Sequence, residues 1–143
     1  MNADEVARRS AEAMWAGDRA SRSLGMEVLY VGPGRATLRM TVTDDMVNGH
    51  AIGHGGYTFT LADSAFAFAC NSYNRVTVAA GAEIRIRAPT RLGDVLTATA
   101  AEREREGRHG TYDISVSTPD GTVVATFVGR SKEIGGSLFE AAP

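Results

Sequence analysis

The alternation of apolar and polar residues between positions 36 and 43 predicts a strand with one buried face. Polar residues separate four apolar ones, namely Ala36, Leu38, Met40 and Val42. A period of two is the repeat of a half-buried β-strand. The glycine- and proline-containing segment 31–35 divides this run from an earlier β-rich one. We therefore expect a strand, a tight turn and a second strand between residues 24 and 43.

The segment from Tyr57 to Cys70 has a different pattern, because it is apolar nearly all round. Four alanines and one leucine lie in it, and neither glycine nor proline interrupts it. This composition favours a helix, and a helix without a polar face is buried on most sides. It is shorter than the about 20 residues that cross a membrane, so we expect it inside the domain. Residues 3–17 predict a short amphipathic helix, which we expect to pack on the body of the domain; a lid or gate is the alternative.

The remaining sequence predicts a glycine-rich loop and four further strands. Residues 44–56 contain four glycines and no periodicity, which is typical of a loop. The strands are expected at residues 76–88, 95–106, 111–117 and 122–134. One long apolar helix against an antiparallel sheet belongs to the α+β class. The order of elements suits the hotdog fold, in which the sheet wraps around one central helix, with residues 1–143 as a single domain.

Composition and charge narrow the classes of function. Fifteen basic and seventeen acidic side chains give a net charge of -2, which argues against a nucleic-acid binder. Cys70 is the sole cysteine, so an intramolecular disulfide is excluded. The N-terminal residues lack the apolar core of a signal peptide, and no apolar run is long enough to span a membrane. We expect a cytoplasmic protein with neither a nucleic-acid nor a membrane partner.

The three histidines and the cysteine form no recognisable metal-ligand spacing, so we expect no metal. A phosphate-binding loop, a dinucleotide fingerprint and the nucleophile elbow of a serine hydrolase are also missing from the sequence.

Asp63 interrupts the apolar pattern in the middle of the predicted central helix. A buried carboxylate costs several kcal/mol unless it is paired, hydrogen-bonded or neutralised. Apolar surroundings raise the pKa of such a group and make it a better proton acceptor. The alternative is a structural role, in which Asp63 bonds a hydroxyl or an amide of another segment. From the residues alone, both interpretations stay open.

Gly55 and Gly56 lie at the predicted start of the same helix. The first N–H groups of a helix have no internal partner and carry the positive end of its dipole. Without side chains in the way, these groups can approach an anion or a developing oxyanion. The alternative is that the two glycines only make a tight entry turn.

The spacing of these candidates predicts an oligomer. Gly55 and Asp63 are eight positions apart, which is about 12 Å along a helix axis. A base and an oxyanion donor must each lie within about 3 Å of the reacting atoms. One helix cannot bring its own Gly55 and Asp63 that close, so two subunits must contribute if both residues act. We therefore expect at least a dimer with two shared sites.

The same residues carry a family resemblance. The segments 48–50, 54–56 and 61–72 closely resemble the PaaI-like thioesterases of phenylacetic-acid degradation, a family of hotdog-fold acyl-CoA thioesterases. The resemblance extends to residues 16–25, 96–100 and 129–136, and so over nearly the whole chain. One departure lies at residues 78–82, where some relatives place a serine or threonine and this chain has none.

The resemblance implies a tetramer of two dimers that hydrolyses acyl-CoA to free acid and CoA. Asp63 is expected to act as general base or nucleophile, and Gly55 to donate its N–H to the thioester oxygen from the other subunit. His54 is expected to place that oxygen or shape the pocket, and Asn48 to orient the water or the thioester. The implied acyl groups are phenylacetyl and hydroxyphenylacetyl. No cofactor is implied, because coenzyme A is part of the substrate.

The phosphates of CoA require basic partners, which charge-assisted contacts can supply. The candidate residues for binding the substrate and its CoA group are Gly56, Arg87, Thr90, Arg91, Arg130 and Lys132. Each basic side chain is alternatively a solvated surface charge.

Two other functions remain open from the sequence. A hotdog hydratase or dehydratase acting on acyl thioesters would use His54 and Asp63 as its acid and base. A non-catalytic acyl-CoA sensor would bind without turnover, although a binder gains nothing from a buried carboxylate.

Overall fold

The structure is a computed structural model that describes residues 1–140. Its elements are α1 (Ala3–Gly17), α2 (Arg19–Ser23), β1 (Glu27–Gly32), β2 (Arg35–Thr41), η1 (Asp44–Met46), α3 (Gly55–Cys70), β3 (Thr77–Ile86), β4 (Val95–Glu106), β5 (His109–Ser117) and β6 (Val123–Glu133). Every helix and strand that the sequence predicts is present. The α3 helix begins two residues earlier than its apolar run, and α2 was not predicted.

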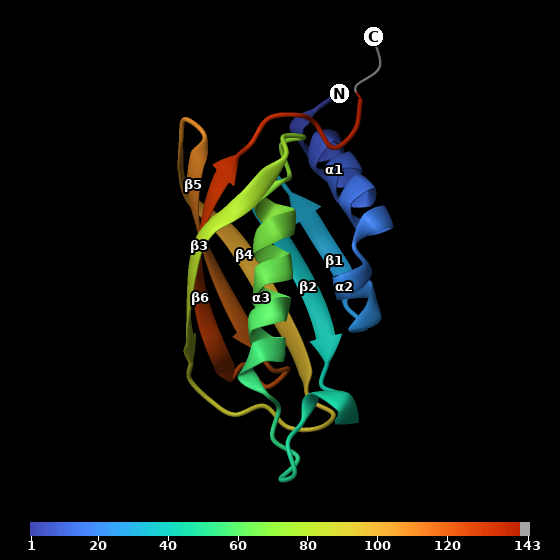
Figure 1. Ribbon diagram of the computed structural model, residues 1–143, viewed down its shortest axis with the longest axis vertical. Coiled ribbons are helices and arrows are strands. Elements are labelled where there is room, and N and C mark those ends of the chain that lie inside the picture. Colours follow the sequence, from blue (N-terminus) through green and yellow to red (C-terminus); the bar gives the residue numbers. More distant parts are fainter. Residues whose placement is uncertain (141–143) are drawn as a thin grey trace.

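The strands form one antiparallel sheet in the order β1-β2-β4-β5-β6-β3. Figure 1 shows the sheet curving around α3, which runs along its inner face. Although β3 and β4 are consecutive in the sequence, the chain crosses from the β3 edge to the middle of the sheet between them. This arrangement is the hotdog fold that the sequence predicted.

The core lies between α3 and the inner face of the sheet. Leu38 of β2, Leu96 of β4 and Phe127 of β6 are almost completely buried there. Phe66 of α3 packs against Gly129, where an added Cβ atom would lie 2.7 Å from the aromatic ring. The size of this glycine therefore determines how closely α3 approaches β6.

The two edges of the sheet differ in what covers them. The β1 edge lies beside α1, and the Trp15 ring of α1 lies 6.3 Å from the Phe68 ring of α3. The other edge, β3, carries exposed apolar side chains, including Val78 at 42% and Ile86 at 53% exposure. A long apolar edge strand invites pairing with another chain. None of the helices in residues 1–140 is long and apolar enough to cross a membrane.

Candidate active site

The start of α3 presents free backbone donors at the surface. His54 is the N-cap residue, and its own N–H donates to the Met46 carbonyl at 2.8 Å. The His54 side chain makes no capping hydrogen bond. Within residues 1–140, the N–H groups of Gly55 and Gly56 have no acceptor, as expected for a first helical turn. The two N–H groups are therefore available to an oxyanion.

One hollow lies on the β3 side of this helix start, and we call it the arginine-side hollow. It measures about 340 Å³ and is lined by Ile52, Gly53, Gly55, Thr58, Ile86, Arg87, Ala88, Pro89 and Thr90. The loops on either side of it are joined, because the Gly53 N–H donates to the Thr90 carbonyl at 2.8 Å. A Cβ atom on Gly53 would collide with the Thr90 hydroxyl. Thr90 is itself buried, so it fixes the wall of the hollow.

A second hollow lies on the side of Thr60, and we call it the threonine-side hollow. It measures about 420 Å³ and is lined by Asp45, Val47, His54, Gly56, Tyr57 and Thr60. Sequence reasoning missed Asp45, Tyr57 and Thr60. The sequence could have predicted Thr60, because Gly56, Thr60 and Asp63 follow the i, i+4, i+7 spacing and therefore share one helix face.

Asp63 lies at the end of that face and is half-buried. Burial raises the pKa of its carboxyl group above the ordinary value. Within residues 1–140, no hydrogen bond reaches the carboxylate, so the structural role considered above has no partner group in the described chain. A desolvated carboxylate without a partner is suited to accept a proton.

Asn48 holds the loop that precedes the helix. Its Oδ1 atom accepts hydrogen bonds from the N–H groups of His50 at 2.9 Å and Ile52 at 3.1 Å. The amide oxygen is therefore used within the loop.

The predicted basic residues divide into two groups. Arg87 lines the arginine-side hollow, and its Nε donates to Thr126 Oγ1 at 3.3 Å. Arg91 adjoins the same hollow, because it forms a β-bridge with Ile52.

Lys132 lies six residues beyond Thr126 on β6, about 20 Å along the strand. Arg130 is nearby and forms an ion pair with Glu83 at 3.3 Å. A single chain thus brings Arg87, Thr90 and Arg91 to the helix start, but not Arg130 and Lys132.

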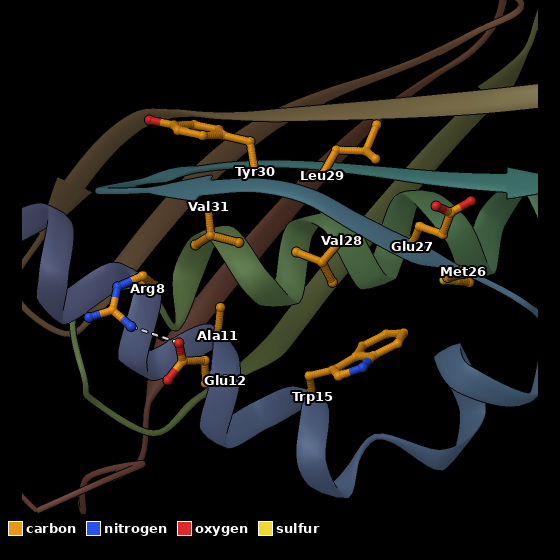
Figure 2. A pocket seen from close by; sticks show the side chains of 10 residues that line it. All are labelled: Arg8, Ala11, Glu12, Trp15, Met26, Glu27, Val28, Leu29, Tyr30 and Val31. Carbon is orange, nitrogen blue, oxygen red and sulfur yellow. Dashed lines mark hydrogen bonds and ion pairs between the residues drawn. The ribbon is translucent and has the colours of Figure 1, made fainter.

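Another groove, of about 410 Å³, lies between α1 and β1. Figure 2 shows Trp15 of α1 beside it, with Val28 and Val31 on the α1 side of the strand and Leu29 and Tyr30 pointing the opposite way. None of the predicted site residues lines this groove, so it is separate from the candidate site.

Residues 1–140 contain no group of three or more histidine, cysteine or acidic side chains arranged to hold a metal ion. Cys70 is buried, and burial raises the pKa of its thiol to about 12. It is therefore a neutral core residue and not a nucleophile.

The sheet that wraps around α3, with free N–H groups at the helix start and Asp63 within it, defines a protein of the hotdog-fold class. The sequence pattern of the Thioesterase superfamily matches residues 50–125, and the chain belongs to this superfamily.

Individual relatives support the assignment of the chain to this superfamily and confirm the resemblance to the PaaI-like thioesterases. The chain is 42% identical over 130 residues to the acyl-coenzyme A thioesterase PaaI of Escherichia coli (strain K12), covering 91% of this chain and 93% of that one. The solved structure of the E. coli PaaI protein from the phenylacetic acid degradation operon matches with a TM-score of 0.93 and 40% identity, over 95% of this chain and 99% of that one. A mutant of the phenylacetic acid degradation protein PaaI from Thermus thermophilus matches with a TM-score of 0.78 and 33% identity, over 82% and 100% of the two chains.

Proposed function

We propose that the protein hydrolyses aryl-acyl-CoA thioesters, of the phenylacetyl-CoA or hydroxyphenylacetyl-CoA type, to the free acid and CoA. The observation that carries the proposal is the pair of groups on α3, namely the unpaired N–H at Gly55 and the desolvated carboxylate of Asp63. The name of the 42% identical relative, an acyl-coenzyme A thioesterase, supports the same chemistry. The reaction takes place in the cytoplasm and needs neither a metal nor a redox cofactor.

In this mechanism the two groups have complementary tasks. The Gly55 N–H donates to the thioester oxygen as negative charge develops on it. Asp63 accepts a proton from water that attacks the carbonyl carbon, or its carboxylate attacks that carbon directly. In either case the tetrahedral intermediate collapses with loss of the CoA thiolate. Attack by water gives the acid directly, whereas direct attack by Asp63 gives an anhydride that a water molecule then hydrolyses to the acid, restoring the carboxylate. His54 shapes the site beside the oxyanion, and the Asn48 Nδ2 group orients the water or the thioester.

The site is shared between two subunits, because one α3 helix separates its own Gly55 and Asp63 by about 12 Å. We infer a homodimer in which β3 pairs with β3 of a second copy and the two α3 helices run antiparallel. The exposed apolar side chains of β3 support this interface. The β3 strand also passes close to the helix start, where a Cβ atom on Gly55 would lie 3.7 Å from Ile86. Two such dimers form the proposed tetramer.

This dimer gives each hollow a separate task. CoA occupies the arginine-side hollow, which Arg87 and Thr90 line and Arg91 adjoins. Gly56 lies at the helix start on the wall of the threonine-side hollow and contacts the substrate from there. The acyl group extends into the threonine-side hollow along Tyr57 and Thr60. Antiparallel pairing of the two β3 strands brings the beginning of one towards Ile86 at the end of the other. Val78, at the beginning of β3, is paired with Lys132 of β6 in its own chain. Arg130 and Lys132 of the second copy therefore complete the basic surface for the CoA phosphates.

Release of free CoA thiol from a panel of aryl and aliphatic acyl-CoAs tests the proposal. The wild type is compared with Asp63→Ala and Asp63→Asn. We expect turnover of aryl-acyl-CoAs in the wild type and its collapse in both variants. Turnover that survives both substitutions would remove Asp63 from the mechanism. Binding of acyl-CoA without turnover, or hydration of an enoyl thioester instead, would replace the hydrolase by a sensor or a hydratase.

A further inference from the structure

Three hydrogen-bonded side chains connect α2 to the central helix, directly beside Asp63. The Oγ atom of Ser21 lies 2.8 Å from Ser64 Oγ and 2.7 Å from Asp18 Oδ2. Asp18 also accepts from the Ser21 N–H at 2.9 Å through its other carboxylate oxygen. Ser21 and Ser64 are almost fully buried, with 1% and 9% exposure.

The direction of these hydrogen bonds follows from the chemistry of the groups. An ionised carboxylate only accepts, so the Ser21 hydroxyl donates to Asp18. The Ser21 oxygen is then the acceptor in its bond with Ser64, and the Ser64 hydroxyl is the donor. The series therefore runs from Ser64 through Ser21 to Asp18. A charged terminal acceptor and the buried setting both strengthen such a series.

A polar contact between these two helices carries a free-energy cost of desolvation. Two alanines would pack there without losing hydration, whereas two buried hydroxyls must bond to each other to recover it. In return, a directional bond fixes one rotation of α3 about its axis. Ser64 follows Asp63 directly, so a rotation that stretches the Ser64–Ser21 bond also turns the Asp63 carboxylate away from the shared site.

The α2 helix is well placed to act as a brace. Its end, at Ser23 and Leu24, lines a hollow of about 340 Å³ together with Tyr57 of the first α3 turn. Its beginning is tied to α1, because the Asp18 N–H donates to the Trp15 carbonyl at 3.3 Å. Five residues do not form a stable helix alone. The position of α2 therefore depends on tertiary contacts, among them the Asp18 cap and the bond to Ser64.

We propose that Asp18, Ser21 and Ser64 position Asp63 for catalysis by fixing the rotation of α3. They are positioning residues, since none of them lines either hollow at the helix start. The inference rests on the proposed role of Asp63. Loss of this positioning is expected to lower kcat without changing KM, because the hollow proposed for CoA lies at the start of α3, away from Ser64.

Steady-state kinetics of Ser64→Ala test this inference. We expect kcat to fall about 10-fold, less than the about 100-fold that a 1 Å misplacement can cause, with KM unchanged. Ser64→Thr keeps the hydroxyl and should retain most of the activity. The matched control is Ser10→Ala, because Ser10 is also fully buried but its hydroxyl donates to the Val6 carbonyl of its own helix, α1, at 2.7 Å. Its kcat should equal that of the wild type.

Ser21→Ala provides a second route to the same result. It removes the acceptor of Ser64, so we expect a similar loss of kcat, and the double variant should be no slower than the slower single variant. Wild-type kcat in Ser64→Ala, or an equal loss in Ser10→Ala, would overturn the positioning role. If Asp63→Asn retains turnover, the role of Asp63 fails and the positioning role fails with it.

Discussion

Gly55 and Asp63 lie on one uninterrupted helix, α3, eight positions and about 12 Å of helix axis apart. A shared site therefore predicts complementation between two inactive variants. Gly55→Pro removes the N–H donor at the first helical position, where proline is tolerated. The preceding His54 already has the extended conformation that proline requires, with φ -68° and ψ 132°.

Mixed dimers of Gly55→Pro and Asp63→Asn should recover activity, whereas each variant alone should be nearly inactive. Each mixed dimer has one site with both groups intact, so random exchange gives about a quarter of wild-type turnover. Thiol release from proteins co-expressed with two different tags measures this recovery. A mixture of Asp63→Ala with Asp63→Asn is the control and should stay inactive. No recovery in verified mixed dimers would place both groups in one subunit.

Asp63→Asn should lose activity without losing stability. Removing a general base lowers kcat by about 10²- to 10⁴-fold. The folded protein holds the Asp63 proton more tightly than the unfolded chain, because burial raises the carboxyl pKa. Stability therefore falls as pH rises from the ordinary pKa through the raised one, and a neutral amide avoids this loss. Thermal unfolding at neutral pH should give a Tm at or above that of the wild type.

Asp113→Asn is the matched control, because the pKa of Asp113 is shifted in the opposite direction from that of Asp63. Hydrogen bonds from Arg103, one of them from its Nε at 2.9 Å, hold the pKa of the Asp113 carboxyl below its ordinary value. Its contribution to stability is present above the unfolded pKa and is lost as pH falls through the lowered one. Because the pair is exposed, the loss of Tm should be small. A clear drop in Tm for Asp63→Asn instead would mean that the charged form of Asp63 is stabilised in the folded protein.

The dependence of kcat/KM on pH should show an acid limb that belongs to Asp63. Activity requires the ionised carboxylate, so it is lost as pH falls through the raised pKa. The midpoint should lie above the ordinary carboxyl value of 3.8. Chromatographic measurement of CoA release across the acid range locates it. A midpoint at or below the ordinary value would contradict a desolvated base.

Two glycine-to-alanine substitutions should have different effects on stability. In Gly129→Ala the new methyl group would lie 2.7 Å from the Phe66 ring, and such overpacking costs about 1–3 kcal/mol. Gly17 has no neighbouring atom within 4 Å of an added Cβ and ends α1. Gly17→Ala should therefore leave stability unchanged or raise it by up to about 1 kcal/mol. Denaturant unfolding of both variants measures the difference, and equal midpoints would show that Phe66 moves aside freely.

The sequence predicted those features that depend on neighbours along the chain. The alternation around Leu38 and Met40 identified a strand, and the apolar run containing Asp63 identified a buried helix. Local periodicity carries this information, since each element shows its own repeat. The candidate pair Gly55 and Asp63 followed from the same helix, because helix geometry fixes their separation. The short α2 helix was missed, since five residues are too few to show a helical period.

By itself, then, the sequence determined the helices and strands, the family resemblance and the separation of Gly55 from Asp63, which is too long for both to act in one site of one chain. Only the tertiary structure decided that β3 crosses to the edge of the sheet, that Thr60 shares a hollow with Asp45, and that Ser64 bonds to Ser21. These are contacts between residues distant in the sequence, which local patterns do not specify. Packing of α3 against the whole sheet selects them, because the arrangement that buries the most apolar surface is a property of all the elements together.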